Sequence, residues 1–446
     1  MQQLHSSGPS IRLSRPVMSA MVICGLVLLL QVPIALIRGV IAERVTTRSE
    51  ALIEVTELWG GAQSIVGPRL VVPVRDDTHA LGFATDGEAG GSPEFATFLP
   101  TSLAVRADLA TETLSRGLFA VPVYRARVTL RGTFEQLDLT ALGLAAEDLR
   151  WDRAALSVEV TDPKSVGSQS VLSWNGVSAD FLPGAATGVD ELPGIHRPVP
   201  LSAGTPADFE ISLELKGSES IWFVPFSRET DVSLHSNWSA PSFAGAWLPT
   251  ERQLDDDGFS AEWSVPFLGR NYPQQWASGD SPLGEISASR FGVELISPVD
   301  HYRMSERSTK YASLFLVLTF GMLWLFDAMA GVRIHPIQYL LIGAAMCLFY
   351  LLELSLSEHV GFMGAYTAAS MSVAGLVATY SVAVLRSVGR GIVVAGVLGL
   401  LYAYLLALLS LEHYALLAGS MGLFLALAAV MYLTRWIDWY RAGAAG

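Results

Sequence analysis

The sequence predicts a polytopic α-helical membrane protein, with six transmembrane helices arranged 1 + 5, that carries one large, mostly-β domain. Two observations lead to this fold class. Six stretches are apolar enough and long enough to cross a bilayer, and a long segment of different character separates the first from the second. A hydrocarbon core of about 30 Å requires about 20 helical residues, and each stretch has that length. The stretches are Val17–Ile37, Tyr311–Gly331, Ile337–Ser357, Val360–Leu385, Gly391–Leu411 and Tyr414–Leu433.

The chain is accordingly divided into five parts. Residues 1–16 form an N-terminal tail, residues 17–37 a transmembrane helix, residues 38–310 the mostly-β domain, residues 311–434 a five-helix bundle and residues 435–446 a C-terminal tail. No A-x-A cleavage pattern follows the first apolar stretch, which is also longer than a typical signal-peptide core. We therefore expect an uncleaved signal anchor. A helical segment at about Thr46–Leu58 is expected to continue from it.

Formal charge is distributed unevenly between these parts. Residues 38–310 have a balance of −15, against −13 for the whole chain. An acidic domain repels nucleic acid and anionic lipid headgroups, so we expect neither as its ligand. The lipid bilayer itself is a partner of the apolar helices.

The basic residues outside the β domain predict the orientation in the membrane. All seven are arginines, and they lie in the two tails and in two of the short loops between spans. The other two short loops carry Glu358–His359 and Glu412–His413 instead. Short loops rich in Lys and Arg stay cytoplasmic. Both termini are therefore expected in the cytoplasm, with residues 38–310 on the opposite side. The arginines are Arg12, Arg15, Arg333, Arg386, Arg390, Arg435 and Arg441.

Alternating apolar and polar residues predict β-structure in the domain. Within Val123–Phe134, Tyr124, Ala126, Val128 and Leu130 point one way and Arg125, Arg127 and Arg131 the other. Several similar strands separated by Gly/Pro turns favour an antiparallel, sandwich-like domain. The arginine row is interpreted either as an anion grip or as a solvated strand face. The eight tryptophans of this domain serve either a glycan or peptide platform or ordinary β-core packing.

Signatures of catalysis, cofactors and metals are missing from the sequence. The eight His are scattered without metal-ligand spacing, and no phosphate-binding glycine loop or G-x-S-x-G elbow is present. We expect no enzymatic activity, no cofactor and no metal. A catalytic site assembled from distant residues stays open as an alternative.

Five polar residues in and beside the bundle are the functional candidates: Asp327, His335, Glu353, Glu358 and His359. Intramembrane acids are functional candidates by default. Asp327 is expected near the inner surface and Glu353 near the outer one, away from the midplane where transported solutes bind. Snorkelling or helix-end hydrogen bonding is the alternative explanation for both.

The remaining three candidates lie at helix ends. His335 with Pro336 suits the start of a helix. Glu358–His359 forms a short polar outer turn, in which His359 is either a pH switch or an interfacial cap. Small residues at every fourth position of the later spans indicate a closely packed bundle. These positions are Ser370–Ala374–Ala378, Gly391–Ala395–Gly399 and Ala418–Gly422–Ala426.

The joins between the domain and the bundle carry a family resemblance. The segments concerned are Phe291–Leu295, Pro298–Tyr302, Arg333–Leu340, Leu354–Phe362 and Tyr414–Ser420, with Pro122–Tyr124, Gly132–Phe134, Pro241–Phe243 and Gly258–Ala261 within the domain. Together they resemble the CreD family of bacterial inner-membrane, cell-envelope-integrity proteins. The resemblance implies a periplasmic domain and a role in envelope stress, and it supplies no cofactor and no catalytic residue.

The sequence therefore predicts a non-enzymatic inner-membrane protein that supports envelope integrity. Its periplasmic domain, residues 38–310, is expected to engage an envelope protein or a cell-wall component. One alternative is a transporter or channel for an envelope-related small solute, based on Asp327 and Glu353. Another is an envelope hydrolase.

Overall fold

The structure is a computed structural model and describes residues 15–75, 95–135, 137–186, 193–277, 281–295, 301–330, 334–411 and 414–435. The predicted tail residues 1–14 and 436–446, Arg12, Arg333, Arg441 and the Glu412–His413 loop lie outside these residues. The chain divides into two compact units, a helical unit (Met1–Arg48 with Val299–Gly446) and a β unit (Ser49–Pro298). These bounds differ from the expected 38 and 310, because the first helix continues beyond the apolar stretch and the helix at 301–310 packs within the helical unit.

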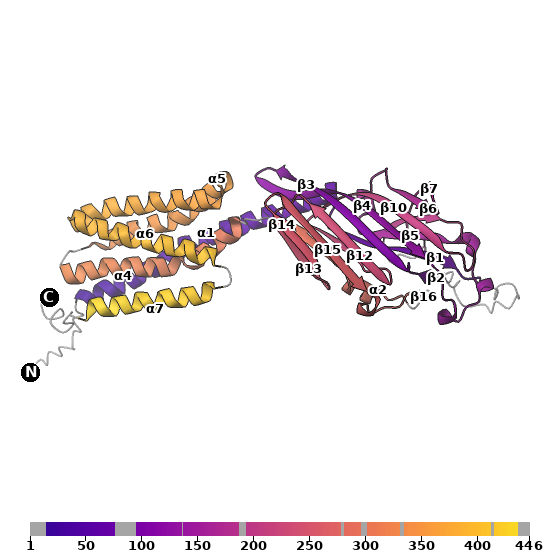
Figure 1. The fold of residues 1–446 in the computed structure, drawn as a ribbon. Coiled ribbons are helices and arrows are strands. Elements are labelled where there is room, and N and C mark those ends of the chain that lie inside the picture. Colours follow the sequence, from indigo (N-terminus) through magenta and orange to yellow (C-terminus); the bar gives the residue numbers. More distant parts are fainter. Residues whose placement is uncertain are drawn as a thin grey trace, which may run out of the picture. The chain divides into compact units, whose positions relative to one another are not determined.

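The helical unit contains long apolar helices (Figure 1) and one short polar helix, α3. Its elements are α1 (Arg15–Trp59, as far as Arg48), α3 (His301–Lys310), α4 (Ala312–Ala330), α5 (Pro336–Leu385), α6 (Val388–Ser410) and α7 (Ala415–Thr434). Helix α1 runs unbroken through the segment expected at Thr46–Leu58. Within the described part of the chain, four helices are long and apolar enough to cross a membrane, and the pair α3–α4, bent by 44°, can form a fifth crossing.

Helix α5 is interrupted at Gly361, whose φ of 75° and ψ of 164° are not helical. The rings of Phe349 and Tyr366 have centroids only 5.4 Å apart. In a straight helix these residues would be separated by about 25 Å along the axis, at 1.5 Å per residue. The chain therefore reverses direction at Gly361, and α5 is a hairpin of two helices. The reversal directly follows Glu358–His359, where the sequence predicted a turn.

Aromatic side chains fill the interior of the helical unit. The ring of Phe349 lies 4.6 Å from that of Tyr402, which also contacts Phe315 at 6.1 Å. Two of the predicted small residues permit close approach: a Cβ on Gly391 would lie 2.2 Å from Val382 Cγ2, and one on Gly422 would meet the Tyr404 hydroxyl. A Cβ on Gly399 would meet nothing within 4 Å, so the small-residue pattern predicts packing at only some of its positions.

The β unit contains two large sheets. Among the described residues, the first has nine strands with the path β13-β17-β11-β1-β5-β9-β8, and β2 pairs with β1 and β16. Its strands are β1 (Gln63–Pro73), β2 (Phe95–Phe98), β5 (Ala155–Val160), β8 (Leu182–Pro183), β9 (Gly194–Pro198), β11 (Ser220–Phe223), β13 (Pro241–Gly245), β16 (Gln275–Ala277) and β17 (Phe291–Leu295). A short helix, α2 (Leu283–Ala288), precedes β17.

The second sheet has eight described strands in the order β14-β15-β12-β3-β4-β10-β6-β7 (Figure 1). They are β3 (Ser102–Arg116), β4 (Phe119–Phe134), β6 (Val171–Trp174), β7 (Val177–Asp180), β10 (Ala207–Ser218), β12 (Glu229–Ser236), β14 (Glu251–Asp255) and β15 (Gly258–Pro266). The expectation of an antiparallel domain is wrong at two pairings, since β1 pairs with β11 and β3 with β12 in parallel. Parallel neighbours require long connections, and both pairs join strands far apart in sequence.

One hydrophobic core contains residues of both sheets. Leu70 and Leu156 of the nine-stranded sheet share it with Val128 and Leu213 of the eight-stranded sheet. The alternation predicted for Val123–Phe134 is confirmed, because Tyr124, Ala126, Val128, Leu130 and Phe134 are buried while Arg125, Arg127 and Arg131 are exposed. Of the tryptophans, Trp174, Trp263 and Trp276 belong to this core, which favours core packing over an aromatic platform for these three.

Candidate functional site

His335 and Asp327 lie at the ends of helices. His335 is the N-cap of α5: its Nδ1 accepts a hydrogen bond from the Ile337 backbone N–H at 3.3 Å, and its own N–H donates to Gln338 Oε1 at 2.9 Å. Asp327, in the last turn of α4, is hydrogen-bonded to Ser19 of α1. Both side chains thus take part in hydrogen bonds at helix ends. For Asp327, helix-end hydrogen bonding was one of the alternatives to a functional role.

Glu353 is completely buried, with a relative exposure of 0 %. Its Oε1 accepts a hydrogen bond from Ser305 Oγ of α3 at 2.7 Å. Its other carboxyl oxygen, Oε2, is buried and has no hydrogen-bond partner among the residues that the structure describes. This burial does not fit snorkelling, which is one of the two alternatives, beside helix-end hydrogen bonding, considered for this residue. Its carboxyl group is enclosed by protein because α3 covers this face of α5.

Glu358 lies on the same helical segment and has a different environment. It accepts a hydrogen bond from the Tyr302 hydroxyl at 3.1 Å, and Arg44 Nε lies 3.6 Å from its Oε1. The Glu358 side chain has a relative solvent exposure of 11 %. Its neighbour His359 is exposed. Glu358 therefore connects three helices, α1, α3 and α5, through one carboxylate.

The amphipathic pattern of α3 explains why these groups meet. Its buried residues are Tyr302, Ser305, Ser308 and Thr309, which recur at helical spacing and present hydroxyl groups. On its exposed side, Glu306 and Lys310 form an i,i+4 ion pair at 3.1 Å. A helix whose buried face is hydroxylic is suited to meet the carboxyl groups of a neighbour.

The candidates therefore separate into two groups. Tyr339, in the first turn of α5, lies close enough to Asp327 to feel its charge. Glu353 follows Tyr339 by fourteen residues, about 21 Å along a helix. The structure thus brings Glu353 and Glu358 to the same face of α3. Asp327 and His335 lie apart from them, near the first turn of α5.

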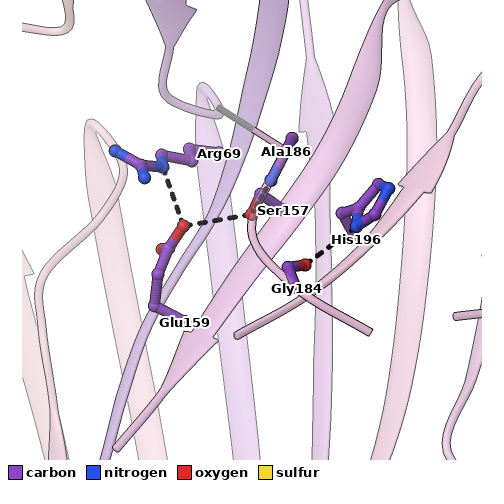
Figure 2. Close-up of polar contacts among 6 residues, drawn as sticks. All are labelled: Arg69, Ser157, Glu159, Gly184, Ala186 and His196. Atoms are coloured by element: carbon purple, nitrogen blue, oxygen red, sulfur yellow. Dashed lines mark hydrogen bonds and ion pairs between the residues drawn. The ribbon is translucent and has the colours of Figure 1, made fainter. Parts of the chain in front are cut away.

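The β unit holds a buried ion pair that the sequence did not reveal (Figure 2). Arg69 Nε of β1 donates to Glu159 Oε1 of β5 at 2.9 Å, and Ser157 Oγ lies 3.0 Å from the same oxygen as a second donor. Arg69 and Glu159 are only 3 % and 2 % exposed. Leu156 and Val158 of β5 point into the core, so Ser157 and Glu159 lie on the opposite face of the sheet. Alternation in the sequence suggested that this face was wet.

Burial of this ion pair removes the Glu159 carboxylate from water, which changes its pKa. Burial raises the pKa of the Glu159 carboxyl, and the Arg69 guanidinium and the Ser157 hydrogen bond oppose that rise. Within the described part of the chain, Arg69 Nη2 and Glu159 Oε2 are buried without hydrogen-bond partners. Beside Glu159 lies a cavity of about 200 Å³, whose lining includes Ser64 and Arg290.

Hydrogen bonds fix the chain on the far side of this pair. Ala186 N–H donates to Ser157 Oγ at 3.5 Å, and His196 Nδ1 lies 2.8 Å from the Gly184 carbonyl oxygen (Figure 2). Ser157 therefore links the ion pair to the backbone that follows β8. In the sequence, the signal for this ion pair is the position of Glu159 between Val158 and Val160 of a strand.

An open groove of about 810 Å³ crosses the eight-stranded sheet. It is lined by charges of both signs and by polar side chains, among them Asp108, Arg127, Glu214, His235 and Asn237. These residues come from β3, β4, β10 and β12 and from the segment after β12. The groove thus offers a polar surface with mixed charge.

The arginine row of β4 is paired with acids on the neighbouring strands. Arg131 Nη2 lies 2.8 Å from Glu210, Arg125 lies 3.5 Å from Glu112 and Arg127 lies 3.9 Å from Glu214. Exposed ion pairs of this kind contribute little to stability, because water screens both charges. The row is therefore a ladder of cross-strand pairs on a solvated face, and the alternative of an anion grip is not supported.

Within the described ranges, no group of three or more His, Cys, Asp or Glu side chains could hold a metal ion.

Comparison with known proteins identifies the family. The family model described as inner membrane protein CreD matches residues 15–440. The chain belongs to the CreD family. The inner membrane protein CreD of Escherichia coli (strain K12) is 34 % identical over 420 residues, which cover 93 % of this chain and 92 % of that protein. The resemblance seen at the joins is thereby confirmed, and membership in the CreD family makes this an inner membrane protein.

A solved structure of a candidate nutrient-binding protein from Legionella pneumophila also aligns with the chain. It covers 57 % of this chain and 84 % of its own, with 7 % identity and a TM-score of 0.28. This likeness carries no argument about the CreD-family chain.

Proposed function

We propose that this protein supports the integrity of the cell envelope without enzymatic activity, and that its β unit binds another envelope component. The observation that carries the proposal is the groove of about 810 Å³ on the eight-stranded sheet of a CreD-family inner membrane protein. A groove lined by Arg127, Lys216, Asp108 and Glu214 suits a polar partner with charges of both signs, such as an envelope protein or a cell-wall peptide.

The proposal includes a topology with six crossings and both termini in the cytoplasm. Support comes from the chain reversal at Gly361, which makes α5 two antiparallel helices, and from the bent α3–α4 pair. Arg15, Arg386, Arg390 and Arg435 all fall on one side in this arrangement. The β unit is then periplasmic, and its two sheets, which share one core, form a sandwich.

Photocrosslinking from the groove tests the partner. A photoreactive p-benzoylphenylalanine is placed at Asn237 or His235 in the full-length chain, in cells under envelope stress. The matched control is Val177, which is exposed on the same sheet but outside the groove. We expect a discrete adduct from the groove positions and none from Val177. Equal crosslinking from all three positions, or none, would contradict the proposal.

The two alternatives have separate tests. A transport site shared by Asp327 and Glu353 finds no support in their distant environments, and the substitution Asp327→Asn is expected to leave stress tolerance unchanged. The hydrolase alternative is tested by incubating the purified full-length protein with peptidoglycan and peptide substrates, where we expect no turnover. A loss of tolerance or measurable turnover would favour the respective alternative.

A further inference from the structure

The carboxyl group of Glu353 has no cation to balance it among the described residues. The basic side chain of Arg44 reaches this segment of α5, where it pairs with Glu358. Arg307 of α3 donates to the backbone carbonyl of Leu408. On the exposed side of α3, Lys310 pairs with Glu306. Glu353 is therefore an acid without an ion pair.

The neighbours of Glu353 on α5 and α6 are uncharged as well. Tyr350 and Tyr366 lie close enough to be affected by its charge, and Tyr366 donates its hydroxyl to the Tyr402 carbonyl at 2.7 Å. Cys347, which precedes Tyr350 by three residues on α5, is buried. From α3, only the hydroxyl of Ser305 is bonded to the carboxyl group. Among the described residues, therefore, one of the two Glu353 carboxyl oxygens, Oε1, has a hydrogen-bond donor.

Ser308 is a second buried polar residue on the same face of α3. It is 0 % exposed, and its Oγ has no hydrogen-bond partner among the described residues. It follows Ser305 by three residues, less than one helical turn, so both residues belong to the buried face of α3. Glu353 Oε2 and Ser308 Oγ are therefore two buried atoms with unused hydrogen-bonding capacity in the described part of the helical unit.

An uncompensated carboxylate in this environment is unfavourable. Removing a carboxylate from water costs several kcal/mol unless it is paired and fully hydrogen-bonded. In a membrane protein, such a group marks an ion or proton site by default. A cation bound at Oε2 would neutralise the charge and satisfy the unpaired oxygen at the same time. A hydroxyl oxygen such as Ser308 Oγ is a suitable additional ligand for a hard cation.

We propose that Glu353, with Ser305 and Ser308, forms a site for one exchangeable monovalent cation, either a proton or Na⁺, within the helical unit. The site does not depend on the proposed envelope function, because it uses none of the groove residues. It also does not require Asp327, which lies at the other end of α5. Ser305 orients the carboxyl group by donating to Oε1, and the cation occupies Oε2.

Carbodiimide labelling tests this site. Dicyclohexylcarbodiimide modifies protonated carboxyl groups in apolar surroundings, and the adduct is located by mass spectrometry of the full-length chain in nanodiscs. We expect modification of Glu353, falling about tenfold per pH unit once the pH exceeds the titration midpoint of the group. Protection by Na⁺ but not by choline identifies a sodium site, and labelling unaffected by Na⁺ identifies a proton site. Glu358, paired with Arg44, is the matched control and should stay unmodified.

A second measurement keeps the proposal testable if the reagent does not reach the site. The melting temperature of the wild type is recorded against pH and Na⁺, beside Glu353→Gln and Glu358→Gln. Because glutamine imitates the protonated carboxyl, Glu353→Gln should fold and should lose the dependence on pH or Na⁺ that the wild type and Glu358→Gln share. Ser308→Ala should weaken any Na⁺ effect several-fold. An unlabelled Glu353 together with identical pH and Na⁺ responses in wild type and Glu353→Gln would overturn the proposal.

Discussion

Replacing Arg69 by methionine tests the buried ion pair of the β unit. The substitution keeps a side chain of similar length but leaves Glu159, which is only 2 % exposed, without its cation. Breaking a buried pair by removing one partner costs about 3–5 kcal/mol. At about 2–4 °C per kcal/mol for a domain of this size, Arg69→Met should lower the melting temperature by about 6–20 °C.

The cost of Arg69→Met should depend on pH. Burial already raises the pKa of Glu159, and Arg69 opposes that rise, so its removal raises the pKa of Glu159 further. A raised pKa in the folded state means that folding favours the protonated acid. The stability contribution is then fully present below the unfolded pKa of about 4.3 and is lost as the pH rises through the folded pKa. Arg69→Met should therefore approach wild-type stability as the pH falls toward about 4.

The double variant Arg69→Met/Glu159→Leu provides the matched control. Apolar replacement of both partners of a buried pair is often neutral or stabilising by about 1–4 kcal/mol, so the double variant should be more stable than Arg69→Met. Unfolding of the β unit in the purified full-length protein is followed by tryptophan fluorescence and pulse proteolysis. Arg69→Met within about 1 kcal/mol of wild type at pH 7, or additive effects of the two single substitutions, would refute the reasoning.

Three further predictions concern single side chains and one turn. The pKa of the exposed Asp138 is lowered, chiefly by the Thr140 hydroxyl, so its stabilising contribution is present above the unfolded pKa and is lost as the pH falls through the folded one. Thr140→Val should return that pKa toward its ordinary value of about 3.9 in ¹³C carboxyl NMR, and an unchanged titration would contradict this. Gly361→Ala should cost about 1–3 kcal/mol in thermal unfolding, because a φ of 75° with a ψ of 164° is accessible essentially only to glycine; an unchanged melting temperature would argue against the α5 reversal. His335→Ala should lose about 0.5–2 kcal/mol through the missing cap, with His335→Asn retaining most of it, and equal stability of all three proteins would exclude the capping role.

The sequence predicted those features that depend on periodicity and local composition. The alternation in Val123–Phe134 identified which residues of β4 face the core, because a strand with one buried face must alternate. The reversal after Glu358–His359 was expected from two polar residues between apolar stretches. The helical segment expected at about Thr46–Leu58, as a continuation of the first span, is part of α1.

The local sequence pattern could not predict contacts between residues that are far apart in the sequence. Glu159 reads as a solvent-facing residue of an alternating strand until Arg69, ninety positions earlier, is placed beside it. Snorkelling or helix-end hydrogen bonding was an alternative for Glu353, because the sequence does not say that α3, with its hydroxyl face, covers this residue. The parallel pairing of β3 with β12 likewise joins segments that no local pattern connects.

The proposed sidedness places the β unit in the periplasm, where it meets its envelope partner. It is tested most directly by single-cysteine labelling in intact cells, using a chain in which Cys24 and Cys347 are replaced by alanine. A cysteine at Leu254 or Leu268, both exposed positions of the β unit, reports sidedness. We predict that a membrane-impermeant maleimide labels both positions in intact cells. Labelling only after the inner membrane is permeabilised would contradict the account.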